Sequence, residues 1–291
     1  MKTNTPYKLS IKEIEEIKEL ARAKRSALGF GNNAPIANEM PLVLESLHIT
    51  SLEFPIKGND ESLAFSAMLL YSKPLTFIGI NTADYYDRQI FAIAHELYHF
   101  YTKTSSQYSE DEHGGDSAVE IKANRFAAEF LLPEEGLRRR IASEFGSYSL
   151  KNVQHQTLLR FIARIHCTWY LPYRSVIRRL DEIEAITTHQ CQRLLTVDER
   201  ALDGEYTRLG QAIDKEVFTK LNTRTEVIGT SAHAIETIIR NFEHKIIDEQ
   251  TFVETLKLFN KSPNDFGYEI TVSQEDIDEF DSFIRGWDSE G

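Results

Sequence analysis

The segment 87–101 constrains the fold of this chain more strongly than any other part of the sequence. Its apolar residues recur at helical spacing and cover nearly the whole circumference, so it should form a buried helix. The same segment carries His95, Glu96 and His99. Burying these polar side chains without partners would cost free energy. A bound metal ion removes the conflict, because histidines at positions i and i+4 lie one turn apart on one helix face and can share it.

Residues 95–99 follow the pattern H-E-x-x-H, which supplies a base as well as two ligands. Glu96 lies beside the two imidazoles, where it can take a proton from an attacking water molecule. We therefore predict a zinc-dependent peptidase that holds one Zn²⁺ per chain. In this prediction His95 and His99 bind the metal, and Glu96 is the catalytic general base.

A catalytic zinc ion needs a third protein ligand. Thr102 and Ser105 stand where one class of zinc peptidases, the metzincins, has Gly and His, so that solution is excluded. Glu120 lies in the first turn of a helix predicted over 117–132 and is the preferred ligand. It also completes an S-x-x-E capping box with Ser117, which would occupy its carboxylate with a backbone N–H. The rival ligands lie in the preceding loop: His113 and Asp116.

The hydrophobic pattern predicts an α+β fold that is predominantly helical. Residues 49–56 form a predicted strand, and 65–71 and 75–80 form a predicted hairpin around Ser72-Lys73-Pro74. Most of the remaining chain has helical periodicity. The predicted helices cover 10–28, 36–47, 87–101, 117–132, 134–146, 155–167, 173–185, 203–221, 231–244 and 248–260.

Two stretches carry a family pattern. Residues 88–99 read R-x-x-F-x-x-A-H-E-L-x-H, and residues 120–133 read E-x-x-A-N-x-F-A-x-x-F-L-L-P, which is close to the family's E-x-x-A-N-x-F-A-x-x-L-L-x-P. In these stretches the chain resembles the ImmA/IrrE family of bacterial metallopeptidases. The resemblance implies a zincin-like peptidase core with a small β-sheet, in which Glu120 joins His95 and His99 as the third zinc ligand. It keeps Glu96 as the general base.

The resemblance also implies roles around the metal. Asn124, one helical turn after Glu120, would orient a ligand. Tyr98 stands where the family usually has Gly, so its ring either packs in the core or faces the site. An oxyanion also needs a donor. The candidate donors are His113, Tyr98 and Tyr101.

The family resemblance implies a regulatory endopeptidase that acts in a stress, mobile-element or phage-defence response. Its protein substrate would be a helix-turn-helix transcriptional repressor or an antitoxin. We expect that substrate to be a separate protein. The alternative is a DNA- or protein-binding regulator, or an antitoxin-like partner, that keeps a structural zinc site and does no proteolysis. Glu96 favours the peptidase, because a structural site needs no general base.

Positive charge is concentrated in one segment of an acidic chain. The net charge is −12, yet residues 137–180 hold nine Lys or Arg and one acid. This segment resembles the helix-turn-helix-like region that follows the peptidase core in the family. Arg174, Arg178 and Arg179 would contact DNA if they are exposed on its second helix. The alternative is a helical buttress whose charges offset the acidic flanks.

We predict three regions: a zincin-like peptidase domain at 1–146, a helix-turn-helix-like segment at 147–200 and a C-terminal helical region of unknown role at 201–291. No apolar run approaches the roughly 20 residues that cross a bilayer. The first ten residues are polar, unlike a secretory signal. We therefore expect a cytoplasmic protein without membrane contact, and reduced thiols at Cys167 and Cys191.

Overall fold

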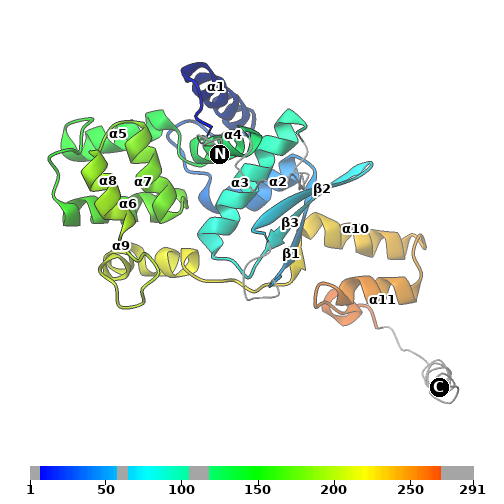
Figure 1. Ribbon diagram of the computed structural model, residues 1–291. Coiled ribbons are helices and arrows are strands. Elements are labelled where there is room, and N and C mark those ends of the chain that lie inside the picture. The colour runs from blue at the N-terminus through cyan, green and yellow to red at the C-terminus, as the bar shows by residue number, and fades with distance from the viewer. Residues whose placement is uncertain (1–6, 58–64, 105–117, 270–291) are drawn as a thin grey trace, which may run out of the picture. The chain divides into compact units, whose positions relative to one another are not determined.

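The computed structural model describes residues 7–57, 65–104 and 118–269. The chain divides into two compact units between Ser231 and Ala232. The first unit contains a four-stranded sheet and most of the helices (Figure 1). In chain order its described elements are α1 (Ile11–Ala27), η1 (Ala37–Glu39), α2 (Met40–Ser46), β1 (Ile49–Phe54), β2 (Ala67–Ser72), β3 (Leu75–Asn81), α3 (Tyr86–Thr102), α4 (Ala118–Leu131), α5 (Glu134–Phe145), α6 (His155–Trp169), α7 (Tyr173–Glu182), α8 (Thr188–Leu195), α9 (Glu205–Leu221) and β4 (Gly229–Thr230).

The sheet is mixed, with the strand order β2-β3-β1-β4. β2 and β3 form the predicted antiparallel hairpin, in the register Ala67↔Ile80 to Ser72↔Leu75, and β1 runs parallel to β3. β4 was not predicted, because two residues carry no readable alternation. It pairs with β1, and the Thr230 hydroxyl donates to the Ser51 carbonyl at 2.6 Å. The sheet therefore leaves β2 at one edge.

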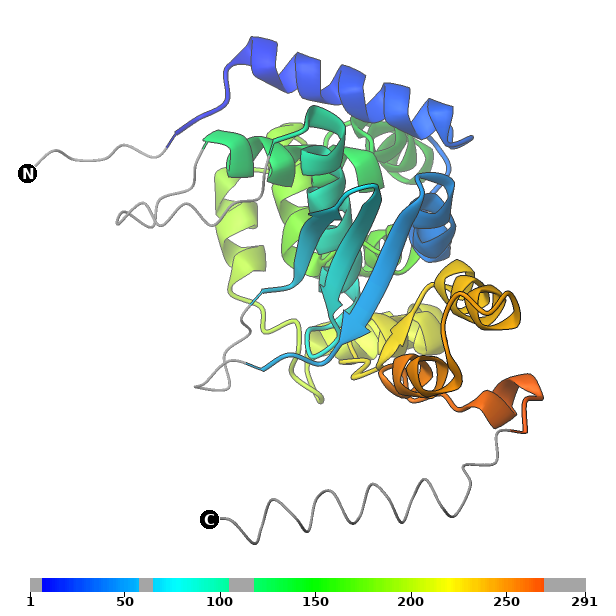
Figure 2. The same ribbon diagram turned by 90° about the vertical axis from the view of Figure 1, so that its right-hand side faces the viewer.

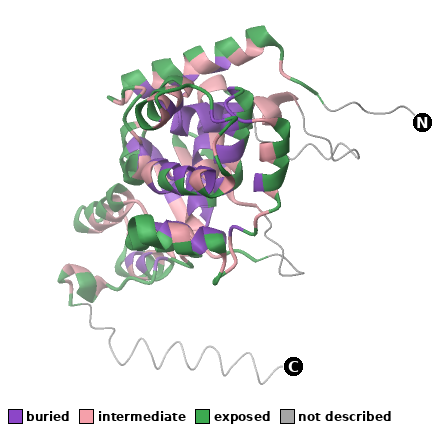
Figure 3. Ribbon diagram, turned by 90° about the vertical axis from the view of Figure 1, so that its left-hand side faces the viewer, coloured by how far each residue is buried: buried purple, intermediate pink, exposed green. Residues whose placement is uncertain are grey.

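Helix α3 lies between the sheet and helices α5 to α8 (Figure 1 and Figure 2). It packs on β2 and β3 through one side and on α4 through another. Figure 1 shows α5 to α8 gathered on the far side of α3 from the strands, and Figure 2 shows the sheet in front of these helices. Buried residues concentrate in the middle of this unit (Figure 3). The expected burial of α3 is confirmed at Ile90, Ile93, Ala94 and Leu97, which are at most 5% exposed.

The amino-terminal helix confirms its sequence signals. Ser10 caps α1 by accepting a hydrogen bond from the Glu13 N–H, and the Glu13 side chain accepts from the Ser10 N–H in return. α1 packs along α4, where Lys122 pairs with Glu13 at 2.8 Å. Helix α1 thereby supports the helix that carries Glu120.

The predicted helix–turn–helix of residues 155–185 forms as α6 and α7. Tyr170, between them, has a left-handed backbone (φ 55°), which reverses the chain before Pro172. One face of α7 is buried through Val176, Ile177 and Leu180. α7 is thus packed into the first unit along that face.

The second unit contains α10 (Ala232–Glu243), α11 (Glu249–Lys257) and η2 (Pro263–Phe266). Asp248 caps α11, and the rings of Phe242 and Phe252 stack at 4.2 Å. The predicted boundaries at 146 and 200 fall inside the first unit, so the functional division there stays a prediction. The predicted fold class is confirmed: the chain is α+β, predominantly helical and zincin-like. Within the described ranges, no helix is long and apolar enough to cross a membrane.

Candidate metal centre

Helices α3 and α4 bring three ligand-type side chains together. The Nε2 atoms of His95 and His99 lie 3.3 Å apart. One carboxylate oxygen of Glu120 lies 3.0 Å from His95 Nε2, and the other lies 3.4 Å from His99 Nε2. Among the residues that the structure describes, these three form the group able to hold a metal ion, with donor atoms within 4.8 Å of one another.

The spacing of these donors fits a tetrahedral metal. Zinc–nitrogen and zinc–oxygen bonds of about 2.0–2.1 Å place tetrahedral ligands about 3.3 Å apart. The three separations at this centre are 3.0, 3.3 and 3.4 Å. Two imidazoles and one carboxylate also form a donor set that suits Zn²⁺ and leaves a fourth position open. The residues present therefore fit the metal.

Two further side chains orient the histidines. Asn124 Oδ1 lies 3.1 Å from His95 Nδ1, and Thr104 Oγ1 lies 3.1 Å from His99 Nδ1. A partner on Nδ1 fixes the ring and directs Nε2 toward the metal position. Asn124 is thus placed where the prediction expects it. Thr104 was missed, because it follows the end of α3, where Lys103 turns left-handed (φ 55°), and belongs to no motif.

Glu96 is buried beside the histidines, and its Oε2 accepts a hydrogen bond of 3.0 Å from the backbone N–H of Leu69. Leu69 belongs to the edge strand β2. Burial raises the pKa of the Glu96 carboxyl to about 7, against the opposing charge of His95. Sequence patterns predicted the strand but not this contact, since no local signal pairs residues 27 positions apart.

The centre opens into a cleft of about 510 Å³. Residues of α3, α4 and α7 line this cleft. Arg88 and Phe91, the first residues of the family pattern, line the cleft on α3. The other lining residues are Ser66, Ala67, Asp84, Ala92, His95, Glu96, Glu120, Asn124, Pro172, Tyr173, Arg174, Ser175, Arg178, Glu199 and Arg200.

Two predicted oxyanion donors lie elsewhere. Tyr98 is 8% exposed and packs its ring 5.6 Å from that of Phe126. The Tyr101 ring lies 6.1 Å from Phe126, and Lys24 covers it at 4.5 Å. Six residues along a helix turn by about 240°, so Tyr101 faces away from His95. Tyr98 therefore takes the core alternative, and Tyr101 packs against the core instead of facing the site as an oxyanion donor. His113, Asp116 and Ser117 lie outside the described residues.

The three predicted DNA contacts occupy different environments. Arg179 is fully buried, so the prediction that it reaches DNA is wrong. Its Nη2 lies 2.6 Å from Glu129, and its Nη1 lies 2.7 Å from Glu182. Arg174 is exposed but pairs with Glu199 at 3.0 Å, and Arg178 lies on the cleft wall. Five of the nine basic residues of 137–180 pair with acids in the described structure: Arg138, Arg139, Arg164, Arg174 and Arg179.

A buried network also holds the start of α3. Asp87 accepts two hydrogen bonds of 2.8 Å from Arg200, and His166 Nε2 lies 3.1 Å from the same carboxylate. Burial would raise the pKa of Asp87, but the hydrogen bond and charge of His166, together with Arg200, hold that pKa below its usual value. The network joins α3, α6 and the segment before α9, and so fixes one end of the cleft.

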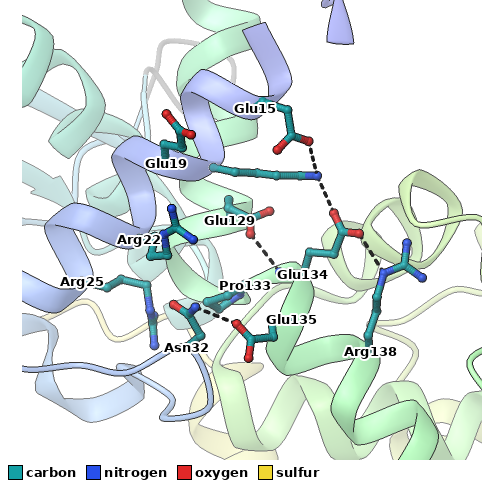
Figure 4. Close-up of a pocket in the computed structure, with 11 residues that line it drawn as sticks. Glu15, Glu19, Arg22, Arg25, Asn32, Glu129, Pro133, Glu134, Glu135 and Arg138 are labelled. Carbon is teal, nitrogen blue, oxygen red and sulfur yellow. Dashed lines mark hydrogen bonds and ion pairs between the residues drawn. The ribbon is translucent and has the colours of Figure 1, made fainter. Parts of the chain in front are cut away.

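A second cleft, of about 400 Å³, lies among α1, α4 and α5 (Figure 4). Several of its polar groups pair with one another: Arg138 forms an ion pair with Glu134 at 2.8 Å, and the Asn32 amide donates to Glu135 at 2.9 Å. Its lining includes none of the three ligand-type residues. It therefore does not compete with the metal centre as the functional site.

Paired histidines on one helix, a glutamate on the next and a buried carboxylate beside them define a metallopeptidase-type centre. Residues 49–161, which contain all four, match the family model of the IrrE N-terminal-like domain, peptidase family M78. This match supports membership of the ImmA/IrrE family of metallopeptidases for the part of the chain that it covers. Searches of curated proteins and of solved structures found no match.

Proposed function

We propose that this protein is a zinc-dependent regulatory endopeptidase that cleaves a partner protein. The observation that carries the proposal is the convergence of His95, His99 and Glu120 beside Glu96 at an open cleft. A structural zinc site is closed by four protein ligands, whereas a catalytic site keeps a position open. This difference favours proteolysis over a regulator that keeps zinc only for structure.

Zn²⁺ held by these residues would supply Lewis acidity that polarises the scissile carbonyl. His95 and His99 would hold the metal as neutral rings, since each Nδ1 has its own partner and Nε2 keeps its lone pair. Glu96 takes the proton of the attacking water and then delivers it to the leaving amine. Its Oε2 is held by Leu69, which leaves Oε1 for proton transfer.

The edge strand supports binding of an extended substrate. β2 is the terminal strand on its side of the sheet, and the N–H of Leu69 points toward Glu96 rather than toward β3. Backbone groups alternate between the two sides of a strand. The outward groups of β2 can therefore pair with a substrate strand next to the metal centre.

The substrate class follows from the family. We infer that the partner is a separate helix-turn-helix repressor or an antitoxin, cleaved in a stress, mobile-element or phage-defence response. This inference is supported by the match of residues 49–161 to the IrrE N-terminal-like domain.

Co-expression with a helix-turn-helix regulator encoded by a neighbouring gene tests the proposal. Wild type should cleave the regulator, and Glu96→Gln should slow cleavage at least about 100-fold, because a general base contributes that much. Zinc content of both proteins, measured on purified samples, should be equal. Glu16→Gln, an exposed glutamate of α1, is the matched control. Cleavage by Glu96→Gln at the wild-type rate would refute the mechanism, and tight binding without cleavage by wild type would favour a binding regulator.

A further inference from the structure

The cleft at the metal centre is lined by an arginine of α7 that the proposed mechanism does not use. Arg178 is exposed on α7 and lines the same cleft as His95, Glu96 and Glu120. Arg174, one helical turn earlier, lines it too. A positive group of α7 therefore faces whatever chain enters the cleft for cleavage.

Arg178 differs from its basic neighbours in the cleft. Arg174 pairs with Glu199 at 3.0 Å, and Arg200 donates to Asp87 at 2.8 Å. Arg88 lies 3.7 Å from Asp84. Within the described ranges, Arg178 forms no hydrogen bond and no ion pair shorter than 4.0 Å. Its guanidinium keeps its donors for a ligand, and a guanidinium binds carboxylates through two parallel hydrogen bonds.

The cleft continues beyond Arg178 into a second compartment of about 410 Å³. The two compartments share Phe91, Asn124, Ser175 and Arg178. Four of the nine residues that line the second compartment are apolar, and the two charged residues away from the junction, Arg125 and Glu182, pair with each other. Its apolar lining residues are Leu9, Phe91, Ile121 and Ala128. A side chain placed there would have an apolar stem and a negatively charged tip near Arg178.

We propose that Arg178 selects substrates that place a carboxylate next to the scissile bond. The carboxylate belongs to an aspartate or glutamate side chain of the cleaved segment, or to a free peptide C-terminus. The proposal rests on the proposed peptidase function and names a specificity-determining residue for it. It also gives Arg178 a role in substrate binding rather than in DNA binding.

Cleavage of synthetic peptide mixtures by the full-length, zinc-loaded protein tests the proposal. Randomised, internally quenched decapeptides reveal which residues flank the cut. The best sequence is then made with Glu or Gln at the enriched position, and with a free or amidated C-terminus. We expect the ratio of kcat/KM for Glu over Gln to be about tenfold in wild type, the effect of one charge-assisted pair.

Substitutions assign that ratio to Arg178. In Arg178→Ala the ratio should fall to about one, and in Arg178→Glu a Lys peptide should become the better substrate. Arg160→Ala, an exposed arginine of α6 that does not line the cleft, should keep the wild-type ratio. Circular dichroism and zinc content verify that each variant is folded and loaded. If amidation lowers kcat/KM of the Glu and Gln peptides alike, and this effect disappears in Arg178→Ala, the recognised carboxylate is the C-terminal one, which still supports Arg178 as its partner.

Other results overturn the proposal. Cleavage that depends on neither the acidic side chain nor the free C-terminus, or a dependence that persists in Arg178→Ala, would overturn it and leave the proposed peptidase standing. Loss of binding to duplex DNA in Arg178→Glu, with the Glu-over-Gln ratio unchanged, would overturn it in favour of a DNA contact. No cleavage of any peptide or of the partner regulator by wild type would refute the peptidase function, and this inference with it.

Discussion

Replacing Arg179 by methionine tests whether the basic segment supports the cleft from inside. The guanidinium donates to Glu129 at 2.6 Å, to Glu182 at 2.7 Å and to the Leu132 carbonyl at 3.2 Å. It thereby ties α7 to the end of α4, the helix that carries Glu120. Removing one partner of a buried ion pair costs about 3–5 kcal/mol, because the other charge stays buried. We expect a value near 3 kcal/mol, since Arg125 lies 3.6 Å from Glu129 and partly compensates.

Urea unfolding followed by the fluorescence of Trp169 measures this loss. Trp169 is fully buried in α6, and Trp287→Phe leaves it as the sole indole. A double change of Arg179→Met and Glu129→Gln should recover most of the loss, because no charge then remains unpaired. Arg178→Met, the exposed neighbour, should stay within about 0.5 kcal/mol of wild type. A loss of unfolding free energy below about 1 kcal/mol in Arg179→Met would refute the supporting role of Arg179.

Three further predictions follow from named contacts. Asn124→Ala should weaken zinc binding about 10–100-fold in chelator competition, whereas Asn124→Asp should retain it; equal affinities would remove Asn124 from the centre. The pKa of Asp87 lies below 3.8 in the folded protein, so its carboxylate stabilises the fold above that pH, and this contribution is lost as pH falls through the lowered pKa. Urea midpoints should therefore fall more steeply with acid in wild type than in Asp87→Asn; parallel curves would contradict this. Gly136→Ala places a methyl group 2.5 Å from the Asn32 carbonyl oxygen and should cost about 1–3 kcal/mol in urea unfolding. An unchanged midpoint would contradict the close approach.

Local signals predicted much of this structure. The apolar periodicity of 87–101 places α3 within one residue of its observed bounds, Tyr86–Thr102. Ser10 caps α1 as expected, and the hairpin turns where Pro74 predicts it. These features depend on residues a few positions apart, and such spacing can be read from the sequence directly.

The rest depends on contacts between distant residues. Thr104 reaches His99 only because the chain turns back after α3, and Leu69 meets Glu96 only because β2 forms the sheet edge. β4 exists through its pairing with β1 and has no pattern of its own. No spacing rule reports these contacts, because each requires the fold to be known first.

The wrong prediction for Arg179 has a different cause, because its burial could have been inferred from the sequence. Val176, Ile177 and Leu180 mark the buried face of α7, and Arg179 lies three residues after Val176 on that face. Arg174 and Arg178 are four residues apart and share the opposite face. A count of charges along a segment ignores the position of each residue around the helix. That position decides which arginines are exposed to solvent.

The net charge of the whole chain likewise says little about the charge at one particular site. A net charge of −12 favours approach by a basic partner, and a DNA-binding repressor would present such a surface. Salt screens charges over a Debye length of about 8 Å at physiological ionic strength, so groups that line the cleft act on a bound chain more strongly than distant surface charges do. A Zn²⁺ ion bound at the centre would add little net charge, because the carboxylates of Glu120 and Glu96 would offset it. The other three arginines that line the cleft lie beside acidic groups, so Arg178 gives the α7 side of the cleft its positive charge. An acidic enzyme can in this way attract a basic protein as a whole and still select an acidic residue at the bond it cuts.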